Sequence, residues 1–245
     1  MNGSIALAGR IGRYAAGVVL LQALAVAGCD RSPAPAPAPT AAPTPASIAR
    51  PAGPERLVLA FGDSLYAGYG LDRGQSLPDA IEAKLRGAGV NATIVNAGVS
   101  GDTSAAGRQR LAFALDNLKR KPDLVLLGLG GNDVLRQISP AETRANMTAM
   151  LAELDRRGIP VLLTGMKAPP NLGPDYVAQF DAIWPDLAAR YRNTLYPFIL
   201  DGVIGDPALM QADRVHPNVR GVARIADRVT PLVQERLKAA PSIAG

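Results

Sequence analysis

The sequence predicts an α/β domain in which a parallel β-sheet carries helices on both faces. Short segments rich in Val, Ile and Leu alternate with longer segments of helical period, and this alternation is typical of such sheets. The chain has 245 residues, 48% hydrophobic and 19% charged, enough for one globular domain with an appendage. We therefore expect a single folded domain over residues 55–245.

Five strands and five helices follow from the pattern, in alternation. Apolar runs of strand length predict the strands, and segments of helical period with polar or proline starts predict the helices. Pro185 lies inside the fourth predicted helix and should kink or split it, because proline removes a backbone donor. The strands are expected at 56–61, 92–97, 123–129, 159–165 and 195–200, and the helices at 77–88, 103–120, 140–157, 175–192 and 217–238.

Composition excludes several classes of function. The net charge is +5, and without the acid-free first 28 residues the balance is 24 basic to 21 acidic groups, too mild for a nucleic-acid surface. Aromatic residues make up only 4%, so no stacking platform for bases is expected. Cys29 and His216 are the only cysteine and histidine. An internal disulfide and a His/Cys metal cluster are therefore excluded, and we expect neither metal nor cofactor.

Residues 1–28 have the character of an export signal. Arg10 and Arg13 precede "AAGVVLLQALAVAG", an apolar stretch shorter than the roughly 20 residues that a spanning helix needs. The stretch ends in "VAGC", which resembles the bacterial lipoprotein signal, in which the cysteine is acylated and becomes the mature N-terminus. Cys29 is therefore the predicted lipidation site. The alternative is an incidental cysteine after an ordinary signal peptide.

Residues 29–54 are expected to form a tether between this anchor and the domain. Residues 31–54 hold 8 of the 21 prolines and few residues suited to a core. In polyproline II form such a segment reaches on the order of 70 Å. Asp30 resembles the residue that retains lipoproteins in the inner membrane of enteric bacteria. The sequence thus predicts a lipid-anchored protein of the bacterial envelope that faces the periplasm.

Four polar segments are expected to meet at one edge of the sheet. "GDSLYAGYG", "NAGVSGDTS" and "GLGGNDVLR" follow the first three predicted strands, and "ADRVHPN" precedes the last helix. In doubly wound sheets the functional site lies beyond the carboxyl ends of the strands. The only histidine should therefore lie near the serine of the first segment.

Ser64, His216 and Asp213 are the candidates for nucleophilic chemistry. A serine hydroxyl attacks only when a neighbouring base takes its proton, and His216 is the one imidazole available. Pro217 should fix His216 as an extended cap before the last helix, with Pro217 as its first residue. Asp213 can then reach the second ring nitrogen. Taken alone, each residue is as well explained by a turn or a helix cap.

Donors for a developing oxyanion are also present. Backbone N–H groups in glycine turns supply them at little steric cost, and the candidates are the N–H groups of Gly98 and Ser64 and the side-chain amide of Asn132. A turn glycine and a helix cap are the alternative explanations for Gly98 and Asn132. Asp63 and Asp133 are interpreted as turn and cap carboxylates.

The four segments together resemble the blocks of the SGNH, or GDSL-type, hydrolase superfamily. The resemblance covers residues 56–235 and implies a flavodoxin-like three-layer α/β/α sandwich with a five-stranded parallel sheet. It also implies a Ser64, Asp213 and His216 triad and an oxyanion hole formed by Ser64, Gly98 and Asn132. The longer strings look closest to the bacterial periplasmic branch with esterase, arylesterase, thioesterase and lysophospholipase activities.

The expected substrate is a small-molecule or lipid acyl ester. Loops 134–138 and 166–174 flank the inferred site and are apolar enough to line an acyl groove, which we expect to include Val134, Leu135, Ile138, Pro169 and Tyr176. The alternatives are a polysaccharide O-acetyl esterase and a catalytically silent binding lipoprotein. We expect a monomer.

Overall fold

The computed structural model describes residues 50–239. The predicted signal peptide, Cys29 and most of the predicted tether lie outside these residues. In the described part, no helix combines the length and the apolar character needed to cross a membrane.

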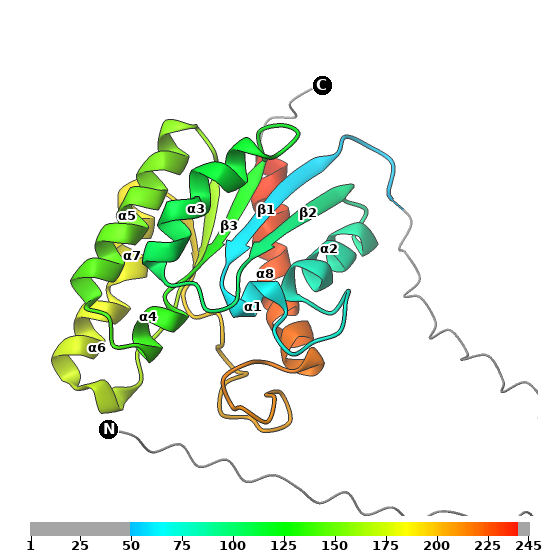
Figure 1. The fold of residues 1–245 in the computed structure, drawn as a ribbon. Coiled ribbons are helices and arrows are strands. Elements are labelled where there is room, and N and C mark those ends of the chain that lie inside the picture. Colours follow the sequence, from blue (N-terminus) through cyan, green and yellow to red (C-terminus); the bar gives the residue numbers. More distant parts are fainter. Residues whose placement is uncertain (1–49, 240–245) are drawn as a thin grey trace, which may run out of the picture. The chain divides into compact units, whose positions relative to one another are not determined.

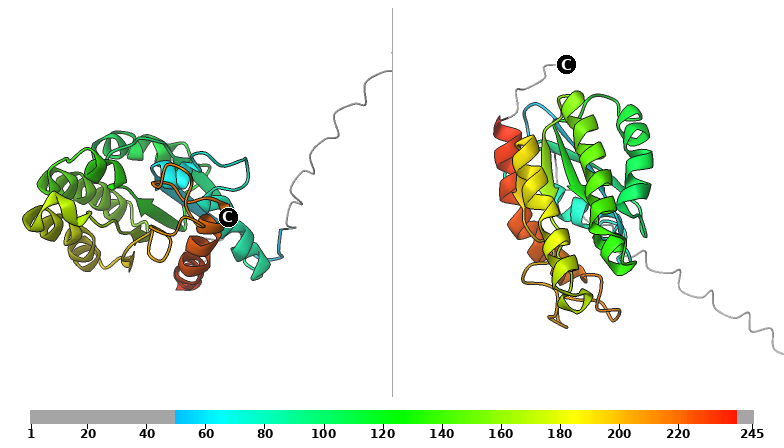
Figure 2. Two further views of the ribbon diagram at one scale, coloured as in Figure 1. Left: turned by 90° about the horizontal axis from the view of Figure 1, so that it is seen from below. Right: turned by 90° about the vertical axis from the view of Figure 1, so that its left-hand side faces the viewer.

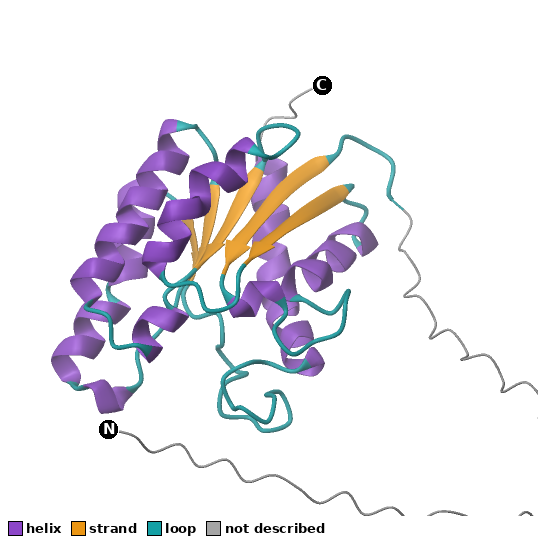
Figure 3. Ribbon diagram, in the orientation of Figure 1, coloured by secondary structure: helices purple, strands orange, loops and turns teal. Residues whose placement is uncertain are grey.

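A five-stranded parallel sheet forms the centre of the domain (Figure 3). Its strand order is β2-β1-β3-β4-β5, so the predicted α/β fold class is confirmed. β1, β3 and β4 lie inside the sheet and are almost entirely buried, whereas the edge strands β2 and β5 are half-buried. The strands are β1 (Arg56–Gly62), β2 (Ala92–Gly98), β3 (Leu124–Gly128), β4 (Val161–Thr164) and β5 (Thr194–Tyr196).

Helices cover both faces of this sheet (Figures 1 and 2). α2 packs against α8, and α3 packs against α5, while α7 contacts α5, β4 and β5. Burial by helices on both faces explains why β3 reads as the uninterrupted apolar run "LVLLG". The helices are α1 (Ser64–Ala67), α2 (Leu77–Gly87), α3 (Ser104–Asp116), α4 (Gly131–Leu135), α5 (Pro140–Arg156), α6 (Pro174–Asp181), α7 (Ile183–Tyr191) and α8 (Val219–Ala239), with a 3-10 helix η1 at Pro170–Leu172.

The predicted boundaries differ from the structure where a side chain or a proline ends an element. β5 stops at Tyr196 rather than residue 200, because Pro197 has no N–H for the ladder. α3 stops at Asp116 rather than residue 120, and Asn117 caps it by donating from Nδ2 to the carbonyl of Phe113 (2.8 Å). The helix predicted at 175–192 is split into α6 and α7 at Ala182, three residues before Pro185. The short helices α1, α4 and η1 were not predicted.

The last helix begins at Val219, so the prediction that Pro217 is its first residue is wrong. Pro217 instead pairs with Met210 in an isolated antiparallel bridge. Asn218 accepts hydrogen bonds from the backbone N–H groups of Arg220 (2.9 Å) and Gly221 (3.1 Å). The stronger capping residue therefore lies two positions after His216, and His216 does not cap the helix.

Tyr66 packs at the point where three strands end. Gly62 of β1 is paired with both Gly98 of β2 and Gly128 of β3, and a Cβ at any of the three would overlap Tyr66. The ring is buried, and its hydroxyl lies 2.9 Å from the Thr164 hydroxyl of β4. This one side chain therefore contacts the carboxyl ends of four strands.

We expect Gly128→Ala to lower the free energy of unfolding by roughly 1–3 kcal/mol, because the added methyl overlaps Tyr66 and Thr164. Gly87→Ala is the matched control. Nothing lies within 4 Å of a Cβ at Gly87, at the end of α2, and this change should be neutral or stabilise by up to about 1 kcal/mol. Urea denaturation measures both, and equal effects would contradict the proposed packing.

Candidate active site

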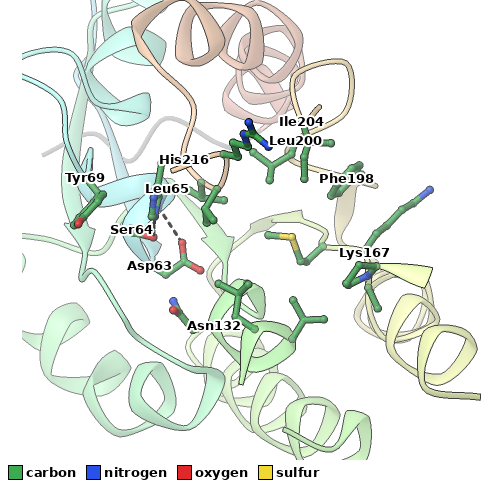
Figure 4. Close-up of a pocket in the computed structure, with 18 of the residues that line it drawn as sticks. Asp63, Ser64, Leu65, Tyr69, Asn132, Lys167, Phe198, Leu200, Ile204 and His216 are labelled. Atoms are coloured by element: carbon green, nitrogen blue, oxygen red, sulfur yellow. Dashed lines mark hydrogen bonds between the residues drawn. The ribbon is translucent and has the colours of Figure 1, made fainter. Parts of the chain in front are cut away.

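The four polar segments meet at the carboxyl edge of the sheet, as the sequence predicted. Ser64 begins α1 directly after β1, Gly101 lies in the loop after β2, and Asn132 lies in α4 after β3. The segment before α8 brings His216 to the same place, and all four residues line one cavity. Figure 4 shows Ser64 and His216 together on one side of this cavity and Asn132 beside them.

Ser64, His216 and Asp213 form a continuous line of hydrogen bonds. The distance from Ser64 Oγ to His216 Nε2 is 2.8 Å, and from His216 Nδ1 to Asp213 Oδ2 it is 2.7 Å. An ionised carboxylate only accepts, so Nδ1 of a neutral imidazole carries the proton here. Nε2 is then left to accept the Ser64 hydroxyl proton, which is the arrangement that a base acting on Ser64 requires.

The turn from Asp213 to His216 is held by its own backbone. Asp213 Oδ1 accepts the N–H groups of Val215 (2.9 Å) and His216 (3.0 Å). Arg214 between them has a φ of 58°, in the left-handed region. The carbonyl of His216 accepts the N–H of Gln211 (2.8 Å), which ties the turn to the preceding segment. Acid and imidazole therefore sit on one small, locally hydrogen-bonded unit.

Asp213 stays ionised far into the acid range. Desolvation alone would raise its pKa, but the hydrogen bonds from the backbone and ring of His216 and from Val215 outweigh it and lower the pKa to about 2. The ring of Tyr69 lies against His216, with 4.5 Å between ring centroids. The imidazole is thus held by a charged partner at one nitrogen and by a ring at its side.

Asp63 fixes the backbone at Ser64. It is the N-cap of α1 and accepts the N–H of Leu65 (3.0 Å), as its interpretation as a turn or cap carboxylate predicted. Only 2% of Asp63 is exposed, and burial raises its pKa to about 6 despite the Leu65 N–H and nearby His216. Asp133, also buried, accepts from the N–H of Ser104 (2.8 Å) and the hydroxyl of Thr143 (3.0 Å), and so joins α3 to α5.

Asn132 lies where the sequence placed it, with one amide hydrogen still available. Its Nδ2 donates to the carbonyl of Asp102 (3.0 Å), which fixes the side-chain orientation and leaves the second hydrogen of the NH₂ group free. The N–H of Ser64 also has no acceptor within residues 50–239. Both residues line the same cavity.

Gly98 does not belong to the cavity, which corrects the prediction that its N–H serves as a donor there. That N–H already donates to Asn96 Oδ1 (2.9 Å), and the residue is absent from the cavity wall. The second glycine of the same loop, Gly101, does line the cavity, with a φ of 87°. Its N–H has no acceptor among the described residues.

Arg110 of α3, which the sequence analysis missed, links the ends of β1 and β2 to the loop between β2 and α3. Its guanidinium donates to the carbonyls of Gly62 (2.9 Å) and Ala97 (2.8 Å) and to the Asp102 carboxylate (2.5 Å). It also lies 3.9 Å above the centroid of the Phe61 ring. The Asp102 carbonyl in turn accepts from Asn132. A long-range contact of this kind has no sequence signal beyond an arginine in an otherwise ordinary helix.

The cavity has a volume of about 660 Å³ and a mostly apolar wall. Val134, Leu135 and Pro169 line it, as predicted. Ile138 and Tyr176 do not: the Tyr176 hydroxyl donates to the carbonyl of Ile138 (2.8 Å), and its ring stacks on Phe180, so this pair supports the structure outside the wall. Met166, Ala168 and Pro170, from the predicted loop 166–174, also line it. Five apolar residues outside both predicted loops complete the wall, namely Leu65, Phe198, Leu200, Ile204 and Val215.

Comparison with known proteins assigns the family. Residues 60–224 match the GDSL-like Lipase/Acylhydrolase family, a span that contains Ser64, Asn132 and His216. The chain belongs to this family. The predicted resemblance to the SGNH, or GDSL-type, hydrolases is therefore confirmed, and the chain is a carboxylic ester hydrolase.

Individual relatives agree with this assignment. The chain is 39% identical to the esterase TesA of Pseudomonas aeruginosa over 180 residues, covering 74% of this chain and 89% of that one. It is 35% identical to the thioesterase 1/protease 1/lysophospholipase L1 of Escherichia coli over 177 residues, covering 72% and 83%. The crystal structure of AlinE4, an SGNH-hydrolase family esterase, is 53% identical, with a TM-score of 0.65 and coverage of 78% and 99%.

The raised pKa of Asp63 predicts a pH-dependent stability. The pKa of Asp63 in the folded protein is about 6, above the usual value of 3.8. Protonation of Asp63 therefore adds its full contribution to the free energy of unfolding below about pH 4, and this contribution is lost as the pH rises through 6. Relative to Asp63→Asn, the wild type should lose roughly 3 kcal/mol of unfolding free energy between pH 4 and 7, from two pK units at 1.36 kcal/mol each. Denaturant titrations across this range measure the difference, and a flat difference would refute the assignment.

Proposed function

We propose that the chain cleaves carboxylic esters through an acyl-enzyme formed on Ser64. The observation that carries this proposal is the hydrogen-bonded line from Asp213 through His216 to Ser64, which opens into an apolar cavity. His216 Nε2 takes the hydroxyl proton as Ser64 Oγ attacks the ester carbonyl carbon. Asp213, with its low pKa, orients the ring and stabilises the imidazolium that forms.

The same groups complete the formation of the acyl-enzyme and then hydrolyse it. His216 returns its proton to the departing alcohol oxygen as the carbon–oxygen bond breaks, which leaves the acyl group on Ser64. Water then enters, and His216 removes a proton from it as its oxygen attacks the acyl carbonyl carbon. The bond from that carbon to Ser64 Oγ breaks, the acid is released, and His216 returns the proton to Oγ, which restores the serine hydroxyl. A base that is held in one tautomer by Asp213 can carry out both steps without moving.

Three donors are proposed for the oxyanion: the N–H groups of Ser64 and Gly101 and the free amide hydrogen of Asn132. All three residues line the cavity, and none of these hydrogens has an acceptor within residues 50–239. Gly101 takes the place that the sequence analysis gave to Gly98. Donors fixed in place before the reaction stabilise the developing charge without reorganisation.

Loss of Ser64 or His216 should lower kcat by roughly 10³-fold or more, and Asn132→Ala by roughly 10² to 10³-fold. Turnover of p-nitrophenyl butyrate measures each variant. A fluorophosphonate probe should label the wild type and Ser100→Ala, whose serine lines the same cavity, but not Ser64→Ala. Wild-type turnover by Ser64→Ala would reject the mechanism.

The acyl group is proposed to be a medium or long apolar chain. The cavity of about 660 Å³ has far more room than an acetyl group fills, and its inner wall consists of buried apolar side chains such as Met166, Ala168 and Leu200. Lipid-derived esters, including those of lysophospholipid type, supply such chains. The Escherichia coli relative carries lysophospholipase in its name, which supports this choice of substrate class.

Extending the acyl chain from acetate to octanoate should raise kcat/KM on p-nitrophenyl esters. Each buried methylene is worth roughly 0.8 kcal/mol, or about fourfold, until the cavity is filled. A series of p-nitrophenyl esters measures this rise. A maximum at acetate, together with faster release of acetate from acetylated polysaccharide, would instead identify a polysaccharide O-acetyl esterase.

We further propose that Cys29 carries a lipid anchor that holds the enzyme on the periplasmic side of the envelope. The proposal rests on the "VAGC" sequence and on the proline-rich residues 31–54. Cells grown with labelled palmitate should yield labelled wild-type protein and unlabelled Cys29→Ala. Absence of label from the wild type, or equal label on both, would exclude the anchor.

A further inference from the structure

Exposed apolar side chains gather at the mouth of the cavity. Of residues 50–239, seven large apolar residues are more than a third exposed, and four of the seven line the cavity. These four come from three separate parts of the chain and are Tyr69 (53% exposed), Leu135 (62%), Ile204 (51%) and Val215 (37%). We call these four residues the rim.

The rim differs from the inner wall of the cavity. Met166, Ala168 and Leu200 are at most 8% exposed, so they can surround an acyl chain without facing solvent. The rim residues border the same cavity yet expose a large part of their surface to water. Exposed apolar clusters of this kind mark contact with another molecule or with a membrane.

Two cations accompany the rim. Lys167 and Arg214 both line the cavity, and neither forms an ion pair within the described residues. Lys167 extends away from the cavity in Figure 4, with its ammonium 5.9 Å from the centroid of the Phe198 ring. Apolar side chains flanked by unpaired cations match the boundary between anionic lipid headgroups and acyl chains.

We propose that the rim, with Lys167 and Arg214, is a membrane-contact surface that binds an anionic phospholipid bilayer. Apolar rim residues enter the headgroup region while the two cations meet lipid phosphates. The cavity mouth then opens directly onto the lipid, so that an acyl chain passes from the bilayer to Ser64 without crossing water. This last step rests on the proposed function, whereas the contact itself does not.

The predicted tether permits this orientation. The described chain enters the domain at the amino end of β1, at the edge of the sheet opposite the cavity. The seven residues of β1 span roughly 23 Å, whereas residues 31–54 reach on the order of 70 Å in polyproline II form. A domain that is anchored in this way can therefore turn the cavity-bearing edge of its sheet toward the bilayer that holds the anchor.

Lipid contact can be measured at single positions because the chain has only one cysteine. Leu135→Cys and Ile204→Cys, in the full-length chain reconstituted into vesicles of phosphatidylcholine and phosphatidylglycerol, would carry an environment-sensitive fluorophore. Phe113→Cys is the matched control, since Phe113 is 72% exposed near the end of α3 that points away from the cavity. Labelling of wild-type protein gives the Cys29 background.

Nitroxide-bearing lipids should quench the fluorophore at positions 135 and 204 and leave position 113 unquenched. In a Lys167→Gln and Arg214→Gln background, or in vesicles of phosphatidylcholine alone, this quenching should be reduced. Equal quenching at all three positions, or none at any, overturns the membrane contact. Because the two rim positions lie on different segments of the chain, one variant that fails to fold does not prevent the test.

A second measurement, on the unlabelled full-length chain, distinguishes a failure of the membrane contact from a failure of the proposed function. Hydrolysis of soluble p-nitrophenyl butyrate without selective quenching at the rim would reject the membrane contact and leave the esterase mechanism standing. Selective quenching without hydrolysis would support the contact and reject the mechanism.

Discussion

The parallel pairing of β1 with both β2 and β3 is the constraint on which the site depends. Gly62 is paired with Gly98 on one side and with Gly128 on the other, so the three strands end at the same level. The segments that follow these strands therefore start side by side at the carboxyl edge of the sheet. Ser64, Gly101 and Asn132, which lie on the segments directly after these strands, reach the same cavity for that reason.

Tyr66 of α1 and Arg110 of α3 both stabilise the aligned ends of these strands. Tyr66, two residues after Ser64, fills the space that the three glycines leave and reaches Thr164 of β4. Arg110 holds the carbonyls of Gly62 and Ala97 together from α3. A large buried ring and a guanidinium with three acceptors therefore fix a site whose reacting groups lie on short segments beyond the strand ends.

The sequence was sufficient for those features that follow from local pattern and topology. Alternation of strands and helices predicted the sheet, and the sheet predicted that Ser64 would meet His216, 152 residues away. Gly98 and Gly101 could not be distinguished in this way. Both are turn glycines, and only the structure shows that the Asn96 side chain already uses the N–H of Gly98. Similarly, Ile138 and Val134 belong to the same apolar sequence segment, 134–138, but only Val134 lines the cavity.

The compact turn from Asp213 to His216 means that the site combines one local contact, between acid and base, with one long-range contact, between base and nucleophile. The contact between the carboxylate and the imidazole is closed within four residues, together with two backbone hydrogen bonds, so it survives any motion that moves this turn as a unit. The 2.8 Å contact between His216 and Ser64 joins the base of that unit to the nucleophile on α1, while Tyr69 contacts the same segment through the His216 ring and through its carbonyl, which accepts from Gln211 Nε2 (2.7 Å). Displacement of this one short segment would separate the base from Ser64 and abolish its activation, while the contact between acid and base and the hydrophobic core stayed intact. Correct placement of residues 211–216 is therefore a condition for activity in addition to folding of the domain.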